Sequence, residues 1–240
     1  MEQAKAWRRD SKVITIIKPL QSFYSSKSKY LLALHSCSES FGIAVKDAED
    51  PENKIESKVF DIGRSLSNKL FICLETMLPK TFWKQIIRIS VAKGPGSFTS
   101  TRLTISMART IAQQINCSLD AMSSFHLMAP RLYKELNKSQ LLEPFWIKDI
   151  LPRRGIVAGK YQFNKIHNER NFHDFSELIS PQLFKNETEI TPSIKATINI
   201  EKDIISLLEF SQYCQDLNLS SNWKNILPIY PTSPIDNKSV

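Results

Sequence analysis

The residues best suited to chemistry form the segment Gly94-Pro95-Gly96-Ser97-Phe98-Thr99, which separates a strand-like apolar run from a helix-like run. Two glycines around a proline favour a tight strand-to-helix turn, because glycine tolerates φ values that other residues avoid and proline fixes its own. The unpaired amides at the following helix start carry partial positive charge and could bind an anion. Ser97 or Thr99 could equally cap that helix. We favour the cap-and-turn interpretation, since the segment lacks both the Walker ending and the GxGxxG spacing.

No arrangement of catalytic or metal-binding side chains accompanies this loop in the sequence. No serine stands in a GxSxG segment, the pattern of an exposed nucleophile. No pair among the four histidines has the HxxxH or HExxH spacing of a metal site on a helix; these are His35, His126, His167 and His173. The sequence therefore predicts no catalytic residue, no metal and no cofactor.

The elements that position the loop follow from the apolar pattern. A continuous apolar run at 30–34 predicts a strand covered on both faces, which should be central. Further strands are predicted at 41–45, 86–91 and 119–122, with a weaker one at 58–60. Helical spacing predicts helices over 65–78, 100–115 and 124–136. In the second half, 145–147 and 156–163 predict strands and 203–216 an amphipathic helix, whereas 164–197 fits neither pattern. We expect a first half over 30–138 and a divergent second half over 139–240 with a C-terminal tail.

Composition sets the broad class of the protein. The apolar fraction of 42% and charged fraction of 23% are ordinary for a globular protein, and no apolar run is long enough to span a bilayer. Cys37, Cys73, Cys117 and Cys214 lie far apart, so buried free thiols are expected. The net charge of +8 favours a polyanionic partner nearby, but direct RNA binding is the minority interpretation. Residues 1–29 form a basic extension, for which an organelle transit peptide is an open alternative.

Several segments resemble the TsaB (YeaZ) family, which supplies a subunit for threonylcarbamoyladenosine modification of tRNA. The strand LALHSC at 32–37 resembles the family's LALDTS-like strand, and VAKGPGSFTSTR at 91–102 resembles its GPGSFTGLR-like loop. Residues 153–157 resemble its RRGEVY strand and 227–230 its closing PLY segment. The resemblance implies an α/β fold of two ribonuclease-H-like halves, as in the actin, hexokinase and heat-shock-chaperone superfamily. Fold alone would not imply a function.

Several residues depart from the family pattern, and these departures argue against catalysis by this chain. His35 stands where relatives typically keep an aspartate, and a neutral imidazole cannot replace a carboxylate on magnesium. The preferred interpretation is a hydrogen-bonded histidine at a strand end. Ser100 and Thr101 stand where the family has Gly-Leu, and their side chains narrow the space above the helix start, which weakens a phosphate-binding role. Pro152 stands where the family tends to have an aspartate before its arginine pair, which removes another carboxylate. Arg102 keeps the family's position, where it holds the loop or meets an acidic partner.

The resemblance implies a non-catalytic, cytoplasmic subunit that pairs with a TsaD-like catalytic subunit through the helices at 65–78 and 99–115. A TsaE-like ATPase would join through that complex, and tRNA would be reached indirectly; a homodimer is an open alternative. Contact candidates on these helices, each of which could instead be an ordinary core residue, are Leu70, Leu74, Met77, Ile105 and Met107. Rival interpretations are a small ATPase or peptidase of the same superfamily, or a chaperone-like binding protein.

Overall fold

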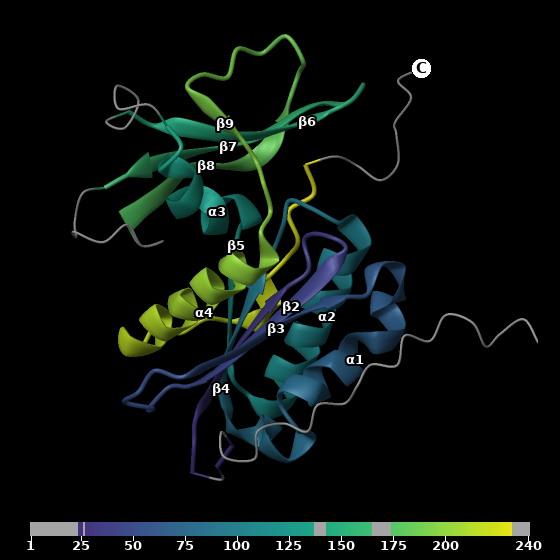
Figure 1. Cartoon of the computed structure of the whole chain (residues 1–240), viewed down its shortest axis with the longest axis vertical. Helices are drawn as coiled ribbons and strands as arrows, with labels where there is room; N and C mark the ends of the chain where they lie inside the picture. Colours follow the sequence, from purple (N-terminus) through teal and green to yellow (C-terminus); the bar gives the residue numbers. More distant parts are fainter. Residues whose placement is uncertain (1–23, 26, 137–142, 165–173, 232–240) are drawn as a thin grey trace, which may run out of the picture.

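The computed structural model describes residues 24–25, 27–136, 143–164 and 174–231, which form an α/β structure around two β-sheets (Figure 1). The first sheet has the strand order β3-β2-β1-β4-β5 and the second the order β8-β7-β6-β9. Within the described ranges, no helix combines the length and apolarity needed to cross a membrane. Most of residues 1–29, including the candidate transit peptide, lies outside the description.

The first sheet is built around a fully buried strand. β1 (Tyr30–His35) pairs antiparallel with β2 (Ser40–Asp47) and parallel with β4 (Ile86–Ala92). β3 (Ile55–Asp61) and β5 (Ser118–Met122) are the two outer strands. All six residues of β1 are buried, as expected of a central strand covered on both faces, so the predicted central position of this strand is confirmed.

Two helices cover one face of the first sheet. After a short 3₁₀ turn, η1 (Gly63–Ser65), α1 (Leu66–Met77) packs its apolar stripe on β2 and β3, and α2 (Phe98–Ile115) packs beside it on β4 and β1. A second 3₁₀ turn, η2 (Lys80–Gln85), leads from α1 into β4. Asn116 ends α2 in the left-handed conformation, as its sequence predicted. The predicted helices at 65–78 and 100–115 are thereby confirmed.

The second sheet repeats the arrangement of the first. β6 (Phe145–Leu151), β7 (Gly155–Phe163) and β8 (Phe175–Phe184) form an antiparallel meander, and the short β9 (Ser193–Lys195) joins β6 in parallel. Three antiparallel strands followed by a parallel fourth is the ribonuclease-H-like pattern expected for both halves. The sequence missed β8 and β9, because β8 is an outer strand of mixed polarity that contains Pro181, a residue tolerated at sheet edges.

The two halves exchange their last helices. α3 (Ser124–Tyr133) follows β5 of the first sheet but packs on β7 and β8 of the second. α4 (Ile200–Asp216) follows β9 of the second sheet but packs on β1, β2 and β4 of the first. A side chain on Gly42 of β2 would lie 2.5 Å from the Ile200 side chain, so the absence of a side chain permits this close packing. The helix predicted for the second half therefore completes the core of the first.

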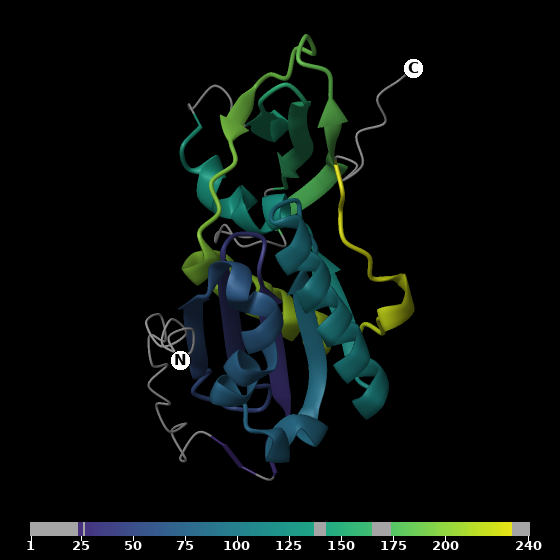
Figure 2. The same ribbon diagram turned by 90° about the vertical axis from the view of Figure 1, so that its right-hand side faces the viewer.

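The chain's end returns along the first half. η5 (Trp223–Asn225) packs against α2 and β5, and Figure 2 shows the yellow C-terminal segment rising beside α2 toward the second sheet. Near the end of α4, the buried Arg88 side chain pairs with Asp120, with Nη1 to Oδ2 at 2.8 Å, and donates to the Leu219 carbonyl. Arg88 therefore links the segment that follows α4 to the first sheet.

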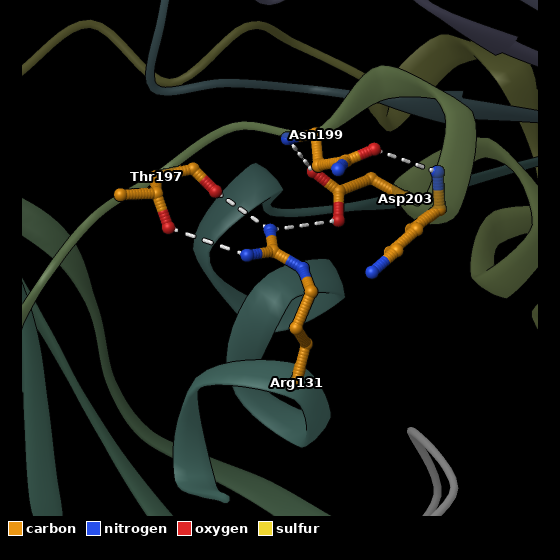
Figure 3. Close-up of polar contacts among 5 residues, drawn as sticks. Arg131, Thr197, Asn199 and Asp203 are labelled. Carbon is orange, nitrogen blue, oxygen red and sulfur yellow. Dashed lines mark hydrogen bonds and ion pairs between the residues drawn. The ribbon is translucent and has the colours of Figure 1, made fainter. Parts of the chain in front are cut away.

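A polar contact ties the exchanged helices together at their crossing (Figure 3). Arg131 of α3 donates from Nη2 to the Thr197 carbonyl at 2.6 Å and to Asp203 Oδ1 of α4 at 3.2 Å. The Asp203 side chain is 1% exposed and also accepts from the Asn199 amide at 2.8 Å. Burial raises the pKa of the Asp203 carboxyl above its usual range, although the Asn199 amide and Arg131 act to lower it.

We expect Arg131→Met to destabilise the chain by about 2–4 kcal/mol at pH 7, because it leaves a buried carboxylate without its cation. The folded pKa of Asp203 already lies above the unfolded value, so ionisation costs stability as pH rises through that interval. Removing Arg131 raises the pKa of Asp203 in the folded chain further, because Arg131 acts to lower it. Urea unfolding should therefore show a larger loss of stability at pH 7 than at acidic pH, because protonation of the carboxyl removes the unpaired charge.

The matched control is Arg154→Met, which removes an exposed arginine from the β6–β7 turn and should change the unfolding free energy by less than about 0.5 kcal/mol. An Arg131→Met variant as stable as the unmodified chain at pH 7 would show that the contact does not hold the two helices.

Candidate functional site

The Gly94–Thr99 loop joins β4 to α2 and lies against the turn that follows β1. The Ser97 amide donates to the Cys37 carbonyl at 2.8 Å. A side chain on Gly96 would place its Cβ 2.1 Å from that same carbonyl oxygen, so only glycine permits the approach. The Ser124 hydroxyl donates to the Pro95 carbonyl at 2.6 Å. The predicted tight strand-to-helix turn is thus present and is fixed from two sides.

The start of α2 differs from the predicted cap. Ser97 occupies the N-cap position, but its hydroxyl donates to Ser100 Oγ at 2.9 Å and caps no backbone amide. Thr99 is an exposed residue of the first turn. Ser100 and Thr101 are buried, and the Thr101 hydroxyl lies 3.7 Å from Cys37 Sγ. The two residues that replace Gly-Leu therefore fill the space beside the helix start.

The closing segment at 227–230 contacts the loop directly. The Ile229 amide donates to the Lys93 carbonyl at 2.7 Å, and the Tyr230 ring lies 4.7 Å from the Phe98 ring. Two segments singled out in the sequence thus form one surface, although Phe98 and Tyr230 lie 132 positions apart in the chain. The RRG segment lies elsewhere, with Arg153 and Arg154 in the β6–β7 turn and Gly155 opening β7.

His35 is a buried histidine at the end of β1. Its Nδ1 accepts from the Cys37 amide at 3.3 Å, and its Nε2 has no hydrogen-bond partner among the described residues. Burial lowers the pKa of His35 to about 3, so the ring is neutral at physiological pH. The preferred interpretation of a hydrogen-bonded strand-end histidine agrees with this geometry. Burial likewise raises the pKa of the neighbouring Cys37 thiol to about 11, which makes it a poor nucleophile.

A cleft of about 580 Å³ opens beside the loop, between the two sheets. The β1–β2 turn, the loop, β6 and the linker after β9 all contribute to its walls; its lining includes Cys37, Ser38, Glu39, Gly96, Asp149 and Ile198. The charged residues on this lining are Glu39 and Asp149, and no described lysine or arginine joins them. Two carboxylates without a nearby cation disfavour a polyphosphate at this position. Among the described residues no group of three metal-binding side chains comes together.

Sequence reasoning missed both carboxylates of the cleft. Glu39 follows β1 by only four residues, so its place at the sheet edge could have been anticipated. Asp149 lies on a strand whose pairing partners were partly unassigned, and no sequence signal placed it opposite Glu39.

A second missed feature joins the halves through a half-buried carboxylate. Glu177 of β8 accepts from the hydroxyls of Ser123 at 2.5 Å and Tyr161 at 3.1 Å. Burial raises the pKa of Glu177, but the hydrogen bonds from Ser123, Ser180 and Tyr161, together with the charge of His126, outweigh burial and leave the pKa below its usual value. Ser123 also caps α3 through the His126 amide. The network therefore fixes α3 to the second sheet.

The predicted contact residues of α1 and α2 fill the chain's own core. Leu70, Leu74, Met77, Ile105 and Met107 are 0–7% exposed and pack against the first sheet. The apolar side chains that α1 presents outward are Phe71, 49% exposed, and Ile72, 52% exposed. The five predicted residues are therefore core residues in the single chain. Arg102, on the first turns of α2, is exposed.

Comparisons with known proteins agree with this architecture. The family model described as TsaD, tRNA N6-adenosine threonylcarbamoyltransferase, matches residues 64–145. The tRNA threonylcarbamoyladenosine biosynthesis protein TsaB of Buchnera aphidicola is 24% identical over 156 residues, which cover 62% of this chain. The chain spans 65% of the length of that relative.

Two solved structures share the fold. YeaZ from Pseudomonas aeruginosa superimposes with a TM-score of 0.61 at 18% identity, covering 84% of this chain and 99% of that one. A protein described as similar to peptidase YEAZ from the same organism gives a TM-score of 0.63 at 18% identity, covering 85% of this chain and 100% of that one. The predicted α/β fold is confirmed, and it is the fold of these two structures. In the Gly94–Thr99 loop, in the matched part of its sequence and in its fold, the chain is thus similar to proteins of the TsaB (YeaZ) family.

Proposed function

We propose that this chain is a non-catalytic subunit for the threonylcarbamoyladenosine modification of tRNA and that it pairs with a TsaD-like catalytic subunit. The observation that carries the proposal is an apolar side of α1 that the described chain leaves exposed, with Phe71 and Ile72 at its surface. The described lining of the cleft, which lies elsewhere, contains no lysine or arginine. The name of the Buchnera relative supports the pathway, and the match of residues 64–145 to the TsaD model supports kinship with the proposed partner.

The proposed docking surface is small, and its aromatic side chain is held in place by a neighbouring ring. Phe71 and Ile72 project from α1, and the Phe71 ring stacks on Trp83 of η2 at 6.4 Å. The Trp83 indole donates to the Leu78 carbonyl at 2.8 Å, so the aromatic pair is anchored to the end of α1. A preorganised aromatic side chain loses little conformational entropy on binding, which makes Phe71 suited to the centre of an interface.

The cleft supports a role without turnover by the chain itself. His35 supplies no charge and no oxygen ligand at the strand end where the superfamily handles metal-bound phosphates. Glu39 and Asp149 line the cleft without a lysine or arginine among the described residues. In this proposal a TsaE-like ATPase and tRNA are reached through the TsaD-like partner in the cytoplasm, and the same α1 surface would support a homodimer when that partner is missing.

The partner proposal predicts that Phe71→Asp with Ile72→Asp abolishes co-purification with a TsaD-like subunit, weakening binding at least about 100-fold, because two charges would replace the buried centre of the interface. Titration calorimetry with the purified pair measures the loss. Ile150→Asp is the matched control, since Ile150 is 62% exposed on β6 in the other half, and it should bind like the unmodified chain. Equal binding by both variants would remove α1 from the interface.

The same proposal predicts that the purified chain alone hydrolyses neither ATP nor peptides above the buffer rate, with magnesium present. In cells lacking their own TsaB-like subunit, the chain should restore threonylcarbamoyladenosine, measured by mass spectrometry of digested tRNA, and the α1 double variant should not. Magnesium-dependent turnover by the isolated chain would favour the rival ATPase interpretation instead.

A further inference from the structure

The C-terminal segment runs back along α2 and forms one surface with it. Trp223 of η5 packs against α2, where the Arg109 guanidinium carbon lies 5.9 Å from the centre of the indole ring. Further along the segment, the Tyr230 ring lies 4.7 Å from the ring of Phe98 at the start of the same helix. The segment is therefore antiparallel to α2, and Figure 2 shows the two side by side. We call residues 93–116 and 217–231 together the α2 surface.

The residues of the α2 surface include several cations and no carboxylate. Of the 240 residues in the chain 24 are acidic, yet none of these falls in 93–116 or 217–231. The two segments contain four basic residues, which are Lys93, Arg102, Arg109 and Lys224. Asp120 of the adjacent β5 is buried and paired with Arg88 at 2.8 Å, so its charge is already balanced. The α2 surface is therefore positively charged.

These cations stand where a ligand can reach them. Arg102 and Lys224 are exposed, and Lys93 and Arg109 are half-buried. Arg102 and Arg109 are seven positions apart on α2, which puts them on one side of the helix at a separation of about 10 Å. The Lys224 ammonium lies 5.7 Å from the centre of the Trp223 ring, the ring that Arg109 also contacts. The positive charge thus follows the helix axis as a row.

Aromatic rings accompany this row of cations. Tyr230 is 42% exposed and Phe98 36% exposed, and Trp223 is half-buried. Proteins that bind single-stranded nucleic acid combine these two kinds of side chain, because cations attract phosphates and exposed rings stack on bases. An acidic peptide needs only the cations. The combination therefore favours RNA over an acidic protein as the ligand.

The neighbouring surfaces of the chain limit where RNA could lie. The cleft at the Pro231 end is lined by Glu39 and Asp149, and these carboxylates repel a phosphate backbone and direct it along α2 toward η5. The α1 docking surface lies on the other side of α2, because α1 packs on β2 and β3 whereas η5 packs against β5 at the opposite edge of the sheet. The α2 surface and the α1 docking surface therefore do not coincide.

We propose that the α2 surface binds RNA directly. Arg102, Arg109 and Lys224 hold phosphates, and an unpaired base stacks on the ring of Tyr230. The identity of the RNA as a tRNA rests on the proposed function, whereas the contact itself rests on the charges and rings of this surface. The chain would then touch the tRNA itself, in addition to reaching it through its partner.

The phosphate contacts can be tested with the full chain alone and a fluorescent single-stranded RNA of about 12 nucleotides, followed by anisotropy. Arg102→Gln with Lys224→Gln should weaken binding roughly tenfold. It should also reduce the slope of log affinity against log salt concentration by about 1.4, since each phosphate contact contributes about 0.7. Arg153→Gln with Arg154→Gln is the matched control, because it removes the same charge from the exposed β6–β7 turn, and it should change neither quantity.

The stacking contact has a different signature. Tyr230→Leu should weaken RNA binding at least about fivefold and leave the salt slope unchanged, because a stacked base releases no counterion. Tyr213→Leu removes a ring of similar exposure, 40%, from α4 on the other face of the sheet, and should bind like the unmodified chain.

Three results would overturn the proposal. One is the absence of RNA binding by the unmodified chain, and another is an equal affinity and salt slope in the α2-surface variant and its arginine control. The third is displacement of the RNA by polyglutamate as effectively as by unlabelled RNA, because an acidic protein would then be the better ligand. These measurements need no catalytic subunit, so their failure is distinct from failure of the proposed pairing.

Discussion

The exchange of α3 and α4 between the two sheets is the constraint on which the rest of the structure depends. Without α4, the face of β1 formed by Leu31 and Ala33 would be open to water, and without α3 the aromatic core of the second sheet would be open in the same way. Burial of these faces supplies most of the driving force for joining the halves. The Arg131–Asp203 contact and the Glu177 network contribute orientation more than net stability, because pairing buried charges largely offsets their desolvation.

This constraint also explains the shape and chemistry of the cleft. The crossing brings the β1–β2 turn of one half opposite β6 of the other, and the cleft forms between them. The same crossing leaves the outward side of α1 uncovered, since α1 and α2 pack on the opposite face of the first sheet from α4. The acidic side chains that line the cleft and the exposed apolar side chains of α1 therefore lie on different parts of the structure.

The sequence predicted the first half well because its signals are local. The apolar run of β1 and the helical spacing of apolar residues in α1 can be recognised from a few neighbouring residues. The glycines and the proline of the Gly94–Thr99 loop likewise predict its turn. The second half was harder, because β8 owes its place to pairing with β7 and carries Pro181, Glu177 and Gln182 on an outer strand. The site was predicted only in part. Periodicity identified Leu70 and Leu74 as apolar surface of α1 but could not say that this surface faces the chain's own sheet, and Asp149 is brought to Glu39 only by the tertiary fold.

The position of α4 near the C-terminus has a consequence for how the chain is made. The first sheet is complete by Met122, yet the helix that buries its second face ends at Asp216. During synthesis at about 5–20 residues per second, roughly 94 residues must still emerge before that helix is available. Any first sheet that forms before then has one apolar face without its cover, and an exposed apolar face of this kind is the surface through which incompletely folded chains aggregate.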